Sequence, residues 1–306
     1  RLNIINFNKK KFNFYLLFGK NGHKKMEDLA LKNLNKLKLS LIYQYINFNS
    51  SNTNFYKEII SIFLFFKKFR EIKPSFIHAV SIKPILICSI LSIYFTKINF
   101  IFAFSGLGYL FTDNNNIKSR LLKNLLLKTL KFIFKIKKNS IIVQNLDDYN
   151  FLKKYLKLSS KEIFLIKGCG VDINLFKPNK NIKKEKIVLF PSRFLKDKGF
   201  FEFVNAAKNL IEFKDWKFIL LGAADYDNPN SVDSKTILKI TENSNIIWID
   251  YTDNILEYYL KSSIICLPSY REGLSKALVE ASSCGCPIVT TDVPGCRETI
   301  INNKSG

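Results

Sequence analysis

The stretch SSIICLPSYREGLSKALVEASSCGCPIVTTDVPGCRE, residues 262–298, decides the fold of this chain. Its apolar run at residues 264–267 predicts a buried strand, which a loop follows. A helix is expected from Leu274 until Gly285 stops it, and a second apolar strand covers residues 288–289. A strand, a loop, a helix and a second strand in this order are typical of an α/β domain with a parallel sheet.

The loop between that strand and that helix carries the polar groups of the stretch. Glu272 lies in the loop, and Glu280 lies about two turns into the helix, with seven residues between the two acids. Gly273 lets the backbone approach a ligand closely. Free amides at the helix start, those of Leu274, Ser275 and Lys276, are suited to binding a diphosphate. A carboxylate inside the helix would repel phosphate, so Glu280 is expected to bind hydroxyl groups such as those of a ribose.

Apolar runs alternate with helical patterns along all 306 residues, which favours parallel-sheet α/β domains throughout the chain. Strands are expected at residues 12–18, 39–46, 75–80, 99–104, 140–144, 163–166, 187–191, 216–221 and 246–249. Helices are expected at residues 24–34, 54–72, 117–140 and 200–213, and from residue 255 onward. The polar run NKNIKKEK at residues 179–186 has no periodicity and predicts a hinge. The chain therefore divides into predicted domains at residues 1–181 and 182–306.

Two of these helices have apolar residues at helical spacing, which we expect to face a sheet. In the helix at residues 54–72 they are Ile59, Ile60, Phe63 and Phe66. In the helix at residues 117–140 they are Leu122, Leu125, Leu126, Ile133 and Ile136, with basic residues on the other face. An interfacial helix on a membrane and an ordinary helix that covers a sheet both have this second pattern. The need of the domain core for an apolar face favours the ordinary helix.

Glu-x7-Glu within residues 269–298 resembles the donor-site signature of the retaining glycosyltransferases of family four. The resemblance covers nearly the whole chain and implies their GT-B architecture, two Rossmann-like α/β domains with a cleft between them. It misses the first strand of the first domain and the last helices of the second, so we interpret the chain as truncated at both ends. It also implies that Glu272 lies beside the donor sugar, that Gly273, Leu274 and Ser275 hold sugar and diphosphate, and that Glu280 holds the ribose. The alternative is an ordinary helix start followed by an unrelated, solvated Glu280.

Arg193 and Lys198 follow the strand predicted at residues 187–191 and lie on either side of a turn. Two cations fixed at the carboxyl end of a strand can neutralise the charge on a departing nucleoside diphosphate. The family that this chain resembles uses an Arg and a Lys at this spacing, which implies a catalytic set of Arg193, Lys198 and Glu272. Ordinary surface charge is the alternative, and it suits Lys196 better than these two. Gly295 is expected to meet the loop that holds Glu272.

Candidate acceptor residues follow two strands of the first domain, because open α/β sheets bind ligands beyond the carboxyl ends of their strands. HAVSIKPI, residues 78–85, resembles the His-x4-Lys-Pro pattern of relatives that use lipid-linked acceptors, which implies that Lys83 attracts an acceptor diphosphate. A solvated or helix-capping Lys83 is the equal alternative. SGLGYLF, residues 105–111, lacks the third glycine of a dinucleotide fingerprint, which argues against a dehydrogenase. It resembles the family's loop that faces the donor sugar, with Ser105, Gly106 and Gly108 as candidates.

Neither a metal ion nor a cofactor is expected. The chain has 2 His and 6 Cys without a Cys-x2-Cys pair, which argues against a metal cage and favours reduced cysteines in the cytoplasm. No apolar run reaches the ~18 residues of a membrane-spanning helix, and no signal peptide is visible. Many members of the family have a His near the position of Ser105, but this chain has none there, so no catalytic base is assigned.

Charge is unevenly distributed between the two predicted domains. Residues 182–306 hold 16 of the 48 basic and 16 of the 25 acidic residues, so the whole net charge of +23 lies in residues 1–181. A basic first domain suggests contact with an anionic lipid surface or with a diphosphate-bearing acceptor. An AT-rich coding sequence that fills solvated positions with Lys and Asn is the alternative, although it explains the neutral second half less well. No zinc finger or RNA-binding signature supports a nucleic-acid partner.

The sequence therefore predicts a retaining glycosyltransferase, either a hexosyl- or an N-acetylhexosaminyltransferase, with a nucleotide-diphosphate sugar, expected to be a UDP-sugar, as donor. The resemblance implies a saccharide or a polyprenyl-diphosphate-linked saccharide as acceptor, in the synthesis of lipopolysaccharide, capsule or another surface polysaccharide. A cytoplasmic protein at the inner face of the plasma membrane is expected. A non-catalytic protein that binds sugar nucleotides or lipids, and an epimerase or phosphorylase on the same fold, are the alternatives. The sugar, the linkage and the oligomeric state are left open.

Overall fold

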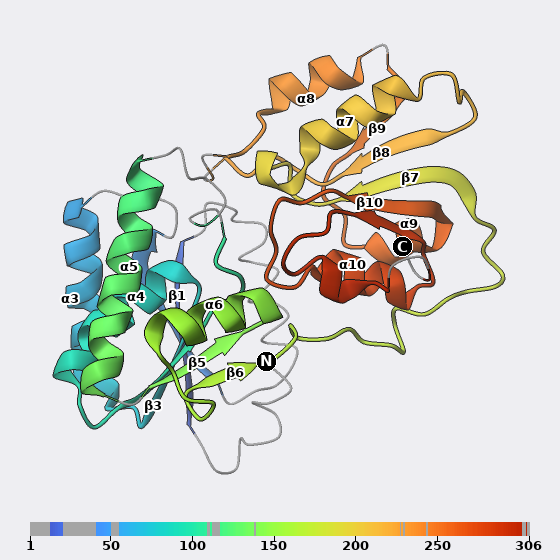
Figure 1. The fold of residues 1–306 in the computed structure, drawn as a ribbon. Coiled ribbons are helices and arrows are strands. Elements are labelled where there is room, and N and C mark those ends of the chain that lie inside the picture. The colour runs from blue at the N-terminus through green and yellow to red at the C-terminus, as the bar shows by residue number, and fades with distance from the viewer. Residues whose placement is uncertain are drawn as a thin grey trace. The chain divides into compact units, whose positions relative to one another are not determined.

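The computed structural model describes residues 13–20, 41–49, 55–108, 111, 117–137, 139–226, 228, 230–242, 244–301 and 304. The chain divides into two compact units, residues 1–75 and 76–306. Both units combine helices with parallel strands, which confirms the predicted α/β fold class (Figure 1). The helix predicted at residues 24–34 lies outside the described residues. The domain boundary near residue 181 and the cleft between the two domains stay predictions.

The first unit contains two strands and a helix in its described part. β1 (Phe14–Lys20) and β2 (Leu41–Asn49) pair in parallel, close to the positions predicted from their apolar runs. α3 (Phe55–Ile72) follows them and packs near β2. A parallel pair needs a long connection between its strands, and the residues between β1 and β2 supply that length.

The second unit contains two separate parallel sheets (Figure 1). In the first sheet the order is β3-β4-β5-β6, so each strand pairs with the next one along the chain. The strands are β3 (Phe76–Val80), β4 (Asn99–Ala103), β5 (Ser140–Val143) and β6 (Ile163–Leu165). The helices that connect them are α4 (Ile82–Tyr94), α5 (Ile117–Ile136) and α6 (Leu146–Leu156). All four strands were predicted to within about two residues.

The second sheet has the strand order β11-β10-β7-β8-β9. Its strands are β7 (Glu185–Pro191), β8 (Lys217–Leu221), β9 (Ile246–Ile249), β10 (Ser262–Leu267) and β11 (Ile288–Thr290). Its helices are α7 (Phe200–Asn209), α8 (Ser234–Thr241), α9 (Ile255–Lys261) and α10 (Lys276–Ser283). The chain runs outward from β7 through β8 to β9 and then returns to the other side of β7 as β10. Open α/β sheets bind ligands where the strand order changes direction in this way, beyond the carboxyl ends of the two strands.

Buried aromatic rings hold the end of β7 and the start of α7. The ring of Phe190 lies 6.3 Å from Phe194, 6.2 Å from Phe200 and 5.3 Å from Phe203. The turn between them, which contains the short 3-10 helix η2 (Lys196–Lys198), is therefore anchored at both ends. These rings belong to the core of the second sheet, which also includes apolar residues of β8 and β10.

The faces of two helices differ from the prediction. Ile59, Ile60 and Phe63 of α3 are exposed, whereas Phe65 and Phe69 are buried with their rings edge to face at 6.1 Å. In α5 the predicted residues Leu126 and Ile133 are buried, but Leu125 and Ile136 are exposed. Both helices have apolar residues on more than one side, so their spacing alone does not show which side faces the core.

Two element starts and several helices also differ from the prediction. β7 begins at Glu185, so the last two residues of the predicted hinge belong to a strand. α10 begins at Lys276 instead of Leu274. α4, α6 and α8 were not predicted, although Asp233 caps the start of α8 by accepting from the amide of Thr236 at 3.0 Å. No helix in the described part of the chain is long and apolar enough to cross a membrane.

Candidate active site

Two loops at the carboxyl ends of β7 and β10 carry the predicted catalytic residues. The β7–α7 loop, residues 192–199, holds Arg193 and Lys198, and the β10–α10 loop, residues 268–275, holds Glu272. Because β7 and β10 pair in parallel, both loops leave the same edge of the sheet. The amide of Tyr270 donates to the carbonyl of Asp197 at 2.9 Å and joins the two loops.

Lys198 and Glu272 form an ion pair with 2.6 Å between Nζ and Oε1. Their side chains are 16% and 12% exposed, so water screens the two charges weakly. Ser269 Oγ donates to the same carboxylate oxygen at 2.9 Å. A predicted cation and a predicted acid therefore meet at one point. An anionic ligand that binds Lys198 has to share this cation with Glu272 or displace the carboxylate.

Arg193 forms its ion pair with Asp225, with 2.5 Å between Nη1 and Oδ2. Asp225 lies after the carboxyl end of β8 and is buried, whereas the side chain of Arg193 is 61% exposed. A second hydrogen bond fixes the acid, because its backbone amide donates to Ser231 Oγ at 2.8 Å. Sequence reasoning missed Asp225. Its position in the loop after the strand predicted at residues 216–221 was the signal that could have made it a candidate.

Gly273 lies against the backbone of residues 105–106. A Cβ on Gly273 would lie 2.1 Å from the carbonyl oxygen of Ser105, and one on Gly106 would lie 2.7 Å from the amide nitrogen of Gly273. Gly106 also has a φ of +108°, which L side chains rarely adopt. The close approach predicted for Gly273 is therefore present, but the group that approaches it is another loop of the protein. Glycine at both positions lets the SGLG segment, residues 105–108, touch the β10–α10 loop.

The turn at Pro294 and Gly295 supports the same loop from the other side. The amide of Glu272 donates to the Pro294 carbonyl at 3.0 Å, and the amide of Ser275 donates to the Gly295 carbonyl at 3.2 Å. A Cβ on Gly295 would lie 2.5 Å from the Glu272 carbonyl oxygen, so the expected contact of Gly295 with this loop is confirmed. The expectation of a free Ser275 amide is wrong, because that amide donates to the Gly295 carbonyl. Ser275 lies before α10, which begins at Lys276.

Glu280 is buried in α10 instead of solvated on its surface. Lys276 Nζ lies 3.2 Å from Oε1, and the hydroxyl of Tyr259 donates to Oε2 at 3.4 Å. Burial and the nearby Glu280 carboxylate raise the pKa of Tyr259, so that phenol stays protonated. The alternative of a solvated Glu280 is therefore wrong, and its role at the ribose stays a prediction.

The candidate acceptor residues follow β3 and β4, which pair in parallel. Lys83 lies half-buried in the first turn of α4, and Ser105 and Gly106 follow β4. Gly108 has a φ of +62°, and a Cβ there would lie 3.8 Å from Cδ1 of Ile82, the residue before Lys83. The amide of Ser81 donates to the Ala103 carbonyl at 3.3 Å, which joins the ends of β3 and β4.

Two cysteines next to these loops have raised pKa values. All six cysteines of the chain are free, and burial raises the pKa of Cys296 to about 11. Burial also raises the pKa of Cys266 to about 11, so both are protonated at neutral pH and are poor nucleophiles. Among the residues that the structure describes, no group of three or more His, Cys, Asp or Glu is arranged to hold a metal ion.

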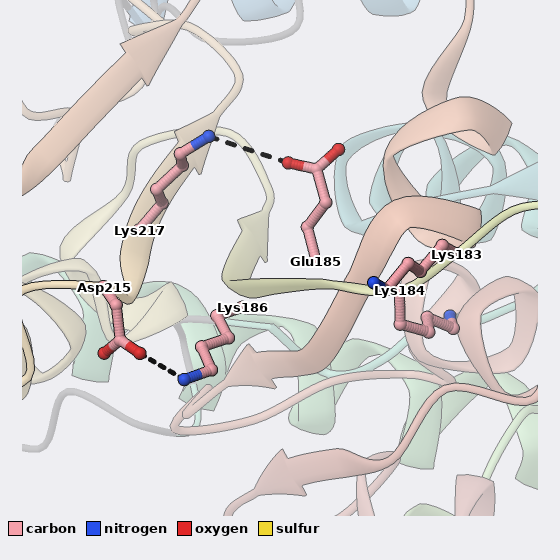
Figure 2. A pocket seen from close by; sticks show the side chains of 6 residues that line it. All are labelled: Lys183, Lys184, Glu185, Lys186, Asp215 and Lys217. Carbon is pink, nitrogen blue, oxygen red and sulfur yellow. Dashed lines mark hydrogen bonds and ion pairs between the residues drawn. The ribbon is translucent and has the colours of Figure 1, made fainter.

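A cavity of about 410 Å³ lies at the amino ends of β7 and β8 (Figure 2). Its lining consists of Lys183, Lys184, Glu185, Lys186, Asp215 and Lys217. Figure 2 shows two ion pairs across it, Lys186 with Asp215 and Lys217 with Glu185. Nζ of Lys184 donates to the Tyr259 carbonyl at 2.9 Å. Two of the four lysines here are paired with acids, and this edge of the sheet is opposite to the one that holds Glu272.

Comparisons with known proteins show what this chain is similar to. Residues 172–306 match the family described as glycosyl transferases group 1. The N,N'-diacetylbacillosaminyl-diphospho-undecaprenol alpha-1,3-N-acetylgalactosaminyltransferase of Campylobacter jejuni is 28% identical over 296 residues, which cover 92% of this chain and 73% of that protein. The UDP-Gal:alpha-D-GlcNAc-diphosphoundecaprenol alpha-1,3-galactosyltransferase of Escherichia coli is 27% identical over 175 residues, which cover 52% of this chain and 44% of that protein.

A solved structure resembles the chain over most of its length. Anabaena HepE, crystallised with UDP and glucose, has a TM-score of 0.65 and 15% sequence identity, and the match covers 95% of this chain and 84% of HepE. An identity this low shows the fold alone. The two parallel-sheet α/β domains of this chain therefore have the GT-B glycosyltransferase fold, and its residues 172–306 match the glycosyl transferases of group 1.

Proposed function

We propose that this protein is a retaining glycosyltransferase that moves a sugar from a nucleotide diphosphate, most simply a UDP-sugar, to an acceptor. The observation that carries the proposal is the ion pair between Lys198 and Glu272, 2.6 Å long, where the strand order of the second sheet changes direction. The match of residues 172–306 to group 1 glycosyl transferases supports it. So does the fold shared with HepE, whose crystals contain UDP and glucose.

In this proposal the β7–α7 loop stabilises the leaving group. Cleavage of the bond between sugar and diphosphate leaves negative charge on the diphosphate, and Lys198 and Arg193 are the cations at that edge of the sheet. Glu272 holds Lys198 before the donor binds and then lies beside the sugar. The backbone groups of Gly273 and Leu274 bind the sugar and the diphosphate. Glu280 binds the ribose from inside α10.

The acceptor is proposed to bind at the SGLG segment and the start of α4, through Lys83, Ser105, Gly106 and Gly108. The names of the Campylobacter and Escherichia relatives describe undecaprenyl-diphosphate-linked acceptors, which supports a lipid-linked saccharide. Transfer of N-acetylgalactosamine by one relative and of galactose by the other leaves open whether the sugar is a hexose or an N-acetylhexosamine. Surface glycan synthesis is the role that this acceptor implies.

A lipid-linked acceptor requires contact with a membrane, and α5 has the surface for it. Five of its apolar residues are 53–65% exposed and recur on one side of the helix: Ile117, Leu121, Leu125, Phe132 and Ile136. The helix also holds Lys118, Arg120, Lys123, Lys128, Lys131 and Lys135, and no acidic residue. An apolar stripe flanked by cations suits the surface of an anionic leaflet. We therefore place the protein, as part of this proposal, at the cytoplasmic face of the plasma membrane.

The test is a transfer assay with the full-length protein. A panel of UDP-sugars is offered with a polyprenyl-diphosphate-linked N-acetylhexosamine, and the product is identified by mass spectrometry and by its anomeric configuration. Transfer with retention is expected for at least one donor. Donor binding without transfer would indicate a non-catalytic sugar-nucleotide protein, and epimerisation or hydrolysis without transfer would indicate one of the other enzymes on this fold.

A further inference from the structure

The first turn of α6 contacts the β10–α10 loop through the side chain of Asn145. Its Nδ2 donates to the Gly273 carbonyl at 2.9 Å and lies 3.3 Å from the Glu272 carbonyl. The same side chain caps α6, because its Oδ1 accepts from the amide of Asp148 at 2.8 Å. Asn145 is fully buried, so its amide group makes these bonds inside the protein. The start of α6 therefore holds the backbone that carries Glu272.

Asp148 is the buried charge of this turn. Its side chain has no exposed surface, and it forms an ion pair with Arg271, the residue before Glu272. One oxygen also accepts from the amide of Leu107 at 3.3 Å and from Asn145 Nδ2 at 3.0 Å. Leu107 belongs to the SGLG segment, so a single carboxylate is bonded to both loops of the proposed site. An acid in the first turn of a helix is also stabilised by the helix dipole.

The Asp148 carboxylate compensates the charge of Arg271. Its side chain is 17% exposed, and its Nε has no hydrogen-bond acceptor among the described residues. The guanidinium lies 5.9 Å from the centre of the Phe111 ring, on the side of the SGLG segment. Removing one partner of a buried ion pair leaves the other charge uncompensated, which is far more costly than losing an exposed pair.

A second acid ties the same helix end to the turn after β11. Glu298 Oε2 accepts from the amide of Gly295 at 2.8 Å, and Oε1 accepts from the amide of Leu146 at 3.2 Å. Leu146 is the first residue of α6. The Pro294–Gly295 turn also contacts the backbone of Glu272. The β10–α10 loop and this turn are therefore both bonded to the start of α6.

We propose that Asn145, Asp148 and Arg271 are positioning residues that set the geometry of Glu272 and Gly273 relative to the SGLG segment. They act through the β10–α10 loop and do not touch the substrate. The expected loss of kcat rests on the proposed transferase function. The expected loosening of the two loops rests on the structure alone. Displacing reacting groups by about 1 Å can cost on the order of 100-fold in rate.

The first experiment compares Asp148→Asn with Asp147→Asn in the full-length enzyme. Asp147 lies on the same turn but forms an exposed pair with Arg297 at 3.3 Å, so it is the matched control. We expect Asp148→Asn to lower kcat by about 100-fold with a donor KM within about 3-fold of wild type. Asp147→Asn is expected to stay within about 2-fold in both. Equal kcat values for the two variants would overturn the proposal.

A double variant separates positioning from simple stabilisation. Asp148→Asn with Arg271→Gln contains no unpaired buried charge, so its melting temperature should recover relative to both single variants. If the pair positions Glu272, kcat stays low in the recovered protein. If kcat recovers together with stability, the pair is only structural and the proposal fails. If Asp148→Asn does not fold, kcat and donor KM are measured for Asn145→Ala and Arg271→Lys instead. The same fall in kcat at a nearly unchanged KM is expected.

Hydrogen exchange tests the coupling without any enzyme activity. In Asp148→Asn the amides of residues 105–108 and 271–275 should exchange at least about 10-fold faster than in wild type. The Leu107 amide loses its carboxylate acceptor, and Asn145, which donates to the Gly273 carbonyl, loses the carboxylate that fixes its side chain. Asp147→Asn should leave these segments unchanged. Faster exchange across the whole unit, or no change in either segment, would contradict the proposal. If wild type shows local coupling but no transfer, the proposed function fails and the coupling stands.

Discussion

Charged residues are arranged differently beside the two sheets of the second unit. Beside the second sheet, Arg193 and Lys198 lie at the end of a strand, and each is paired with an acid. Beside the first sheet, α5 carries basic residues without a single acid on the same helix, around exposed apolar residues. Paired and partly buried cations have a fixed geometry, whereas exposed lysines act through their summed field. The better candidate for a chemical site is therefore in the neutral half of the chain.

Strand order explains the same difference. The described strands of the first sheet follow one another in chain order, but the second sheet changes direction between β7 and β10. Loops that leave a sheet at such a point diverge and leave room for a ligand. From this comparison we propose chemistry at the β7–α7 and β10–α10 loops and a membrane-surface role for α5. The following predictions test that division.

The largest effect is expected for Lys198→Ala. Loss of the cation that pairs with Glu272 removes stabilisation of the leaving diphosphate, and kcat should fall on the order of 1000-fold. Lys196→Ala, an exposed lysine on the same turn, is the control and should stay within about 2-fold. Both are measured with the donor and acceptor that give product with wild type. Equal losses in the two variants would mean that this loop acts only through net charge.

Arg193→Ala should have a smaller effect, about 10- to 100-fold in kcat/KM, because its guanidinium is exposed and screened by water. Asp225→Asn should reproduce part of that loss, since the acid fixes the direction of the arginine. The melting temperature of Arg193→Ala, followed by circular dichroism, should fall modestly, because the buried Asp225 carboxylate loses this cation. A lower melting temperature with unchanged kcat/KM would instead make this pair structural.

Gly273→Ala tests the contact between the two loops. Its new methyl would lie 2.1 Å from the Ser105 carbonyl oxygen, so the free energy of unfolding should fall by about 1–3 kcal/mol. Gly170→Ala is the control, because its φ of +70° strains a side chain while no atom lies within 4 Å. Urea unfolding compares the two. A smaller loss for Gly273→Ala than for Gly170→Ala would show that the loops separate easily.

Leu121→Glu with Phe132→Glu tests the surface role of α5. Binding to vesicles that contain anionic phospholipid should weaken by about 10-fold, because two exposed apolar groups are replaced by acids. Ile211→Glu, an equally exposed apolar residue beside the second sheet, is the control. Turnover of a water-soluble acceptor should not change. Unaltered vesicle binding by the double variant would exclude α5 as the membrane surface.

The smallest effect concerns the cysteines. Burial raises the pKa of Cys88 to about 12 and that of Cys296 to about 11, from an ordinary value near 9.0. Above pH 9 the unfolded chain ionises these thiols and the folded protein does not, so stability should fall as the pH rises from 9 to 11. At pH 8 iodoacetamide should modify the exposed Cys169 first. Faster labelling of Cys296, detected by peptide mapping, would contradict its burial.

Much of the fold was predictable because each strand or helix depends mainly on residues that are close together in the sequence. The strands at residues 187–191 and 246–249 could be predicted from short apolar runs, and their observed bounds differ by at most two residues. The faces of α3 and α5 were not predictable, because apolar residues occur around both helices. Asn145 and Asp148 were missed, although Asn-x-x-Asp at a helix start is a capping pattern that could have been recognised.

The site was predictable in part for a related reason. Parallel strands bring loops at their carboxyl ends to one edge, which is why Lys198 and Glu272 could be expected to meet although 74 positions separate them. Asp225 could not be assigned to Arg193, because nothing in the local sequence indicates which strand neighbours β7. The contact between Asn145 and Gly273 spans 128 positions and has no sequence signal of its own.

The amino-acid sequence by itself determined the alternation of strands and helices, the glycines that permit close backbone contact, and the acids and cations at strand ends. These properties depend on neighbours within a few residues, which the chain order already contains. Only the tertiary structure decided which loops touch and which charges are buried together, as for Asp148 with Arg271. Those contacts depend on the order in which the strands pair, and that order results from packing the whole sheet.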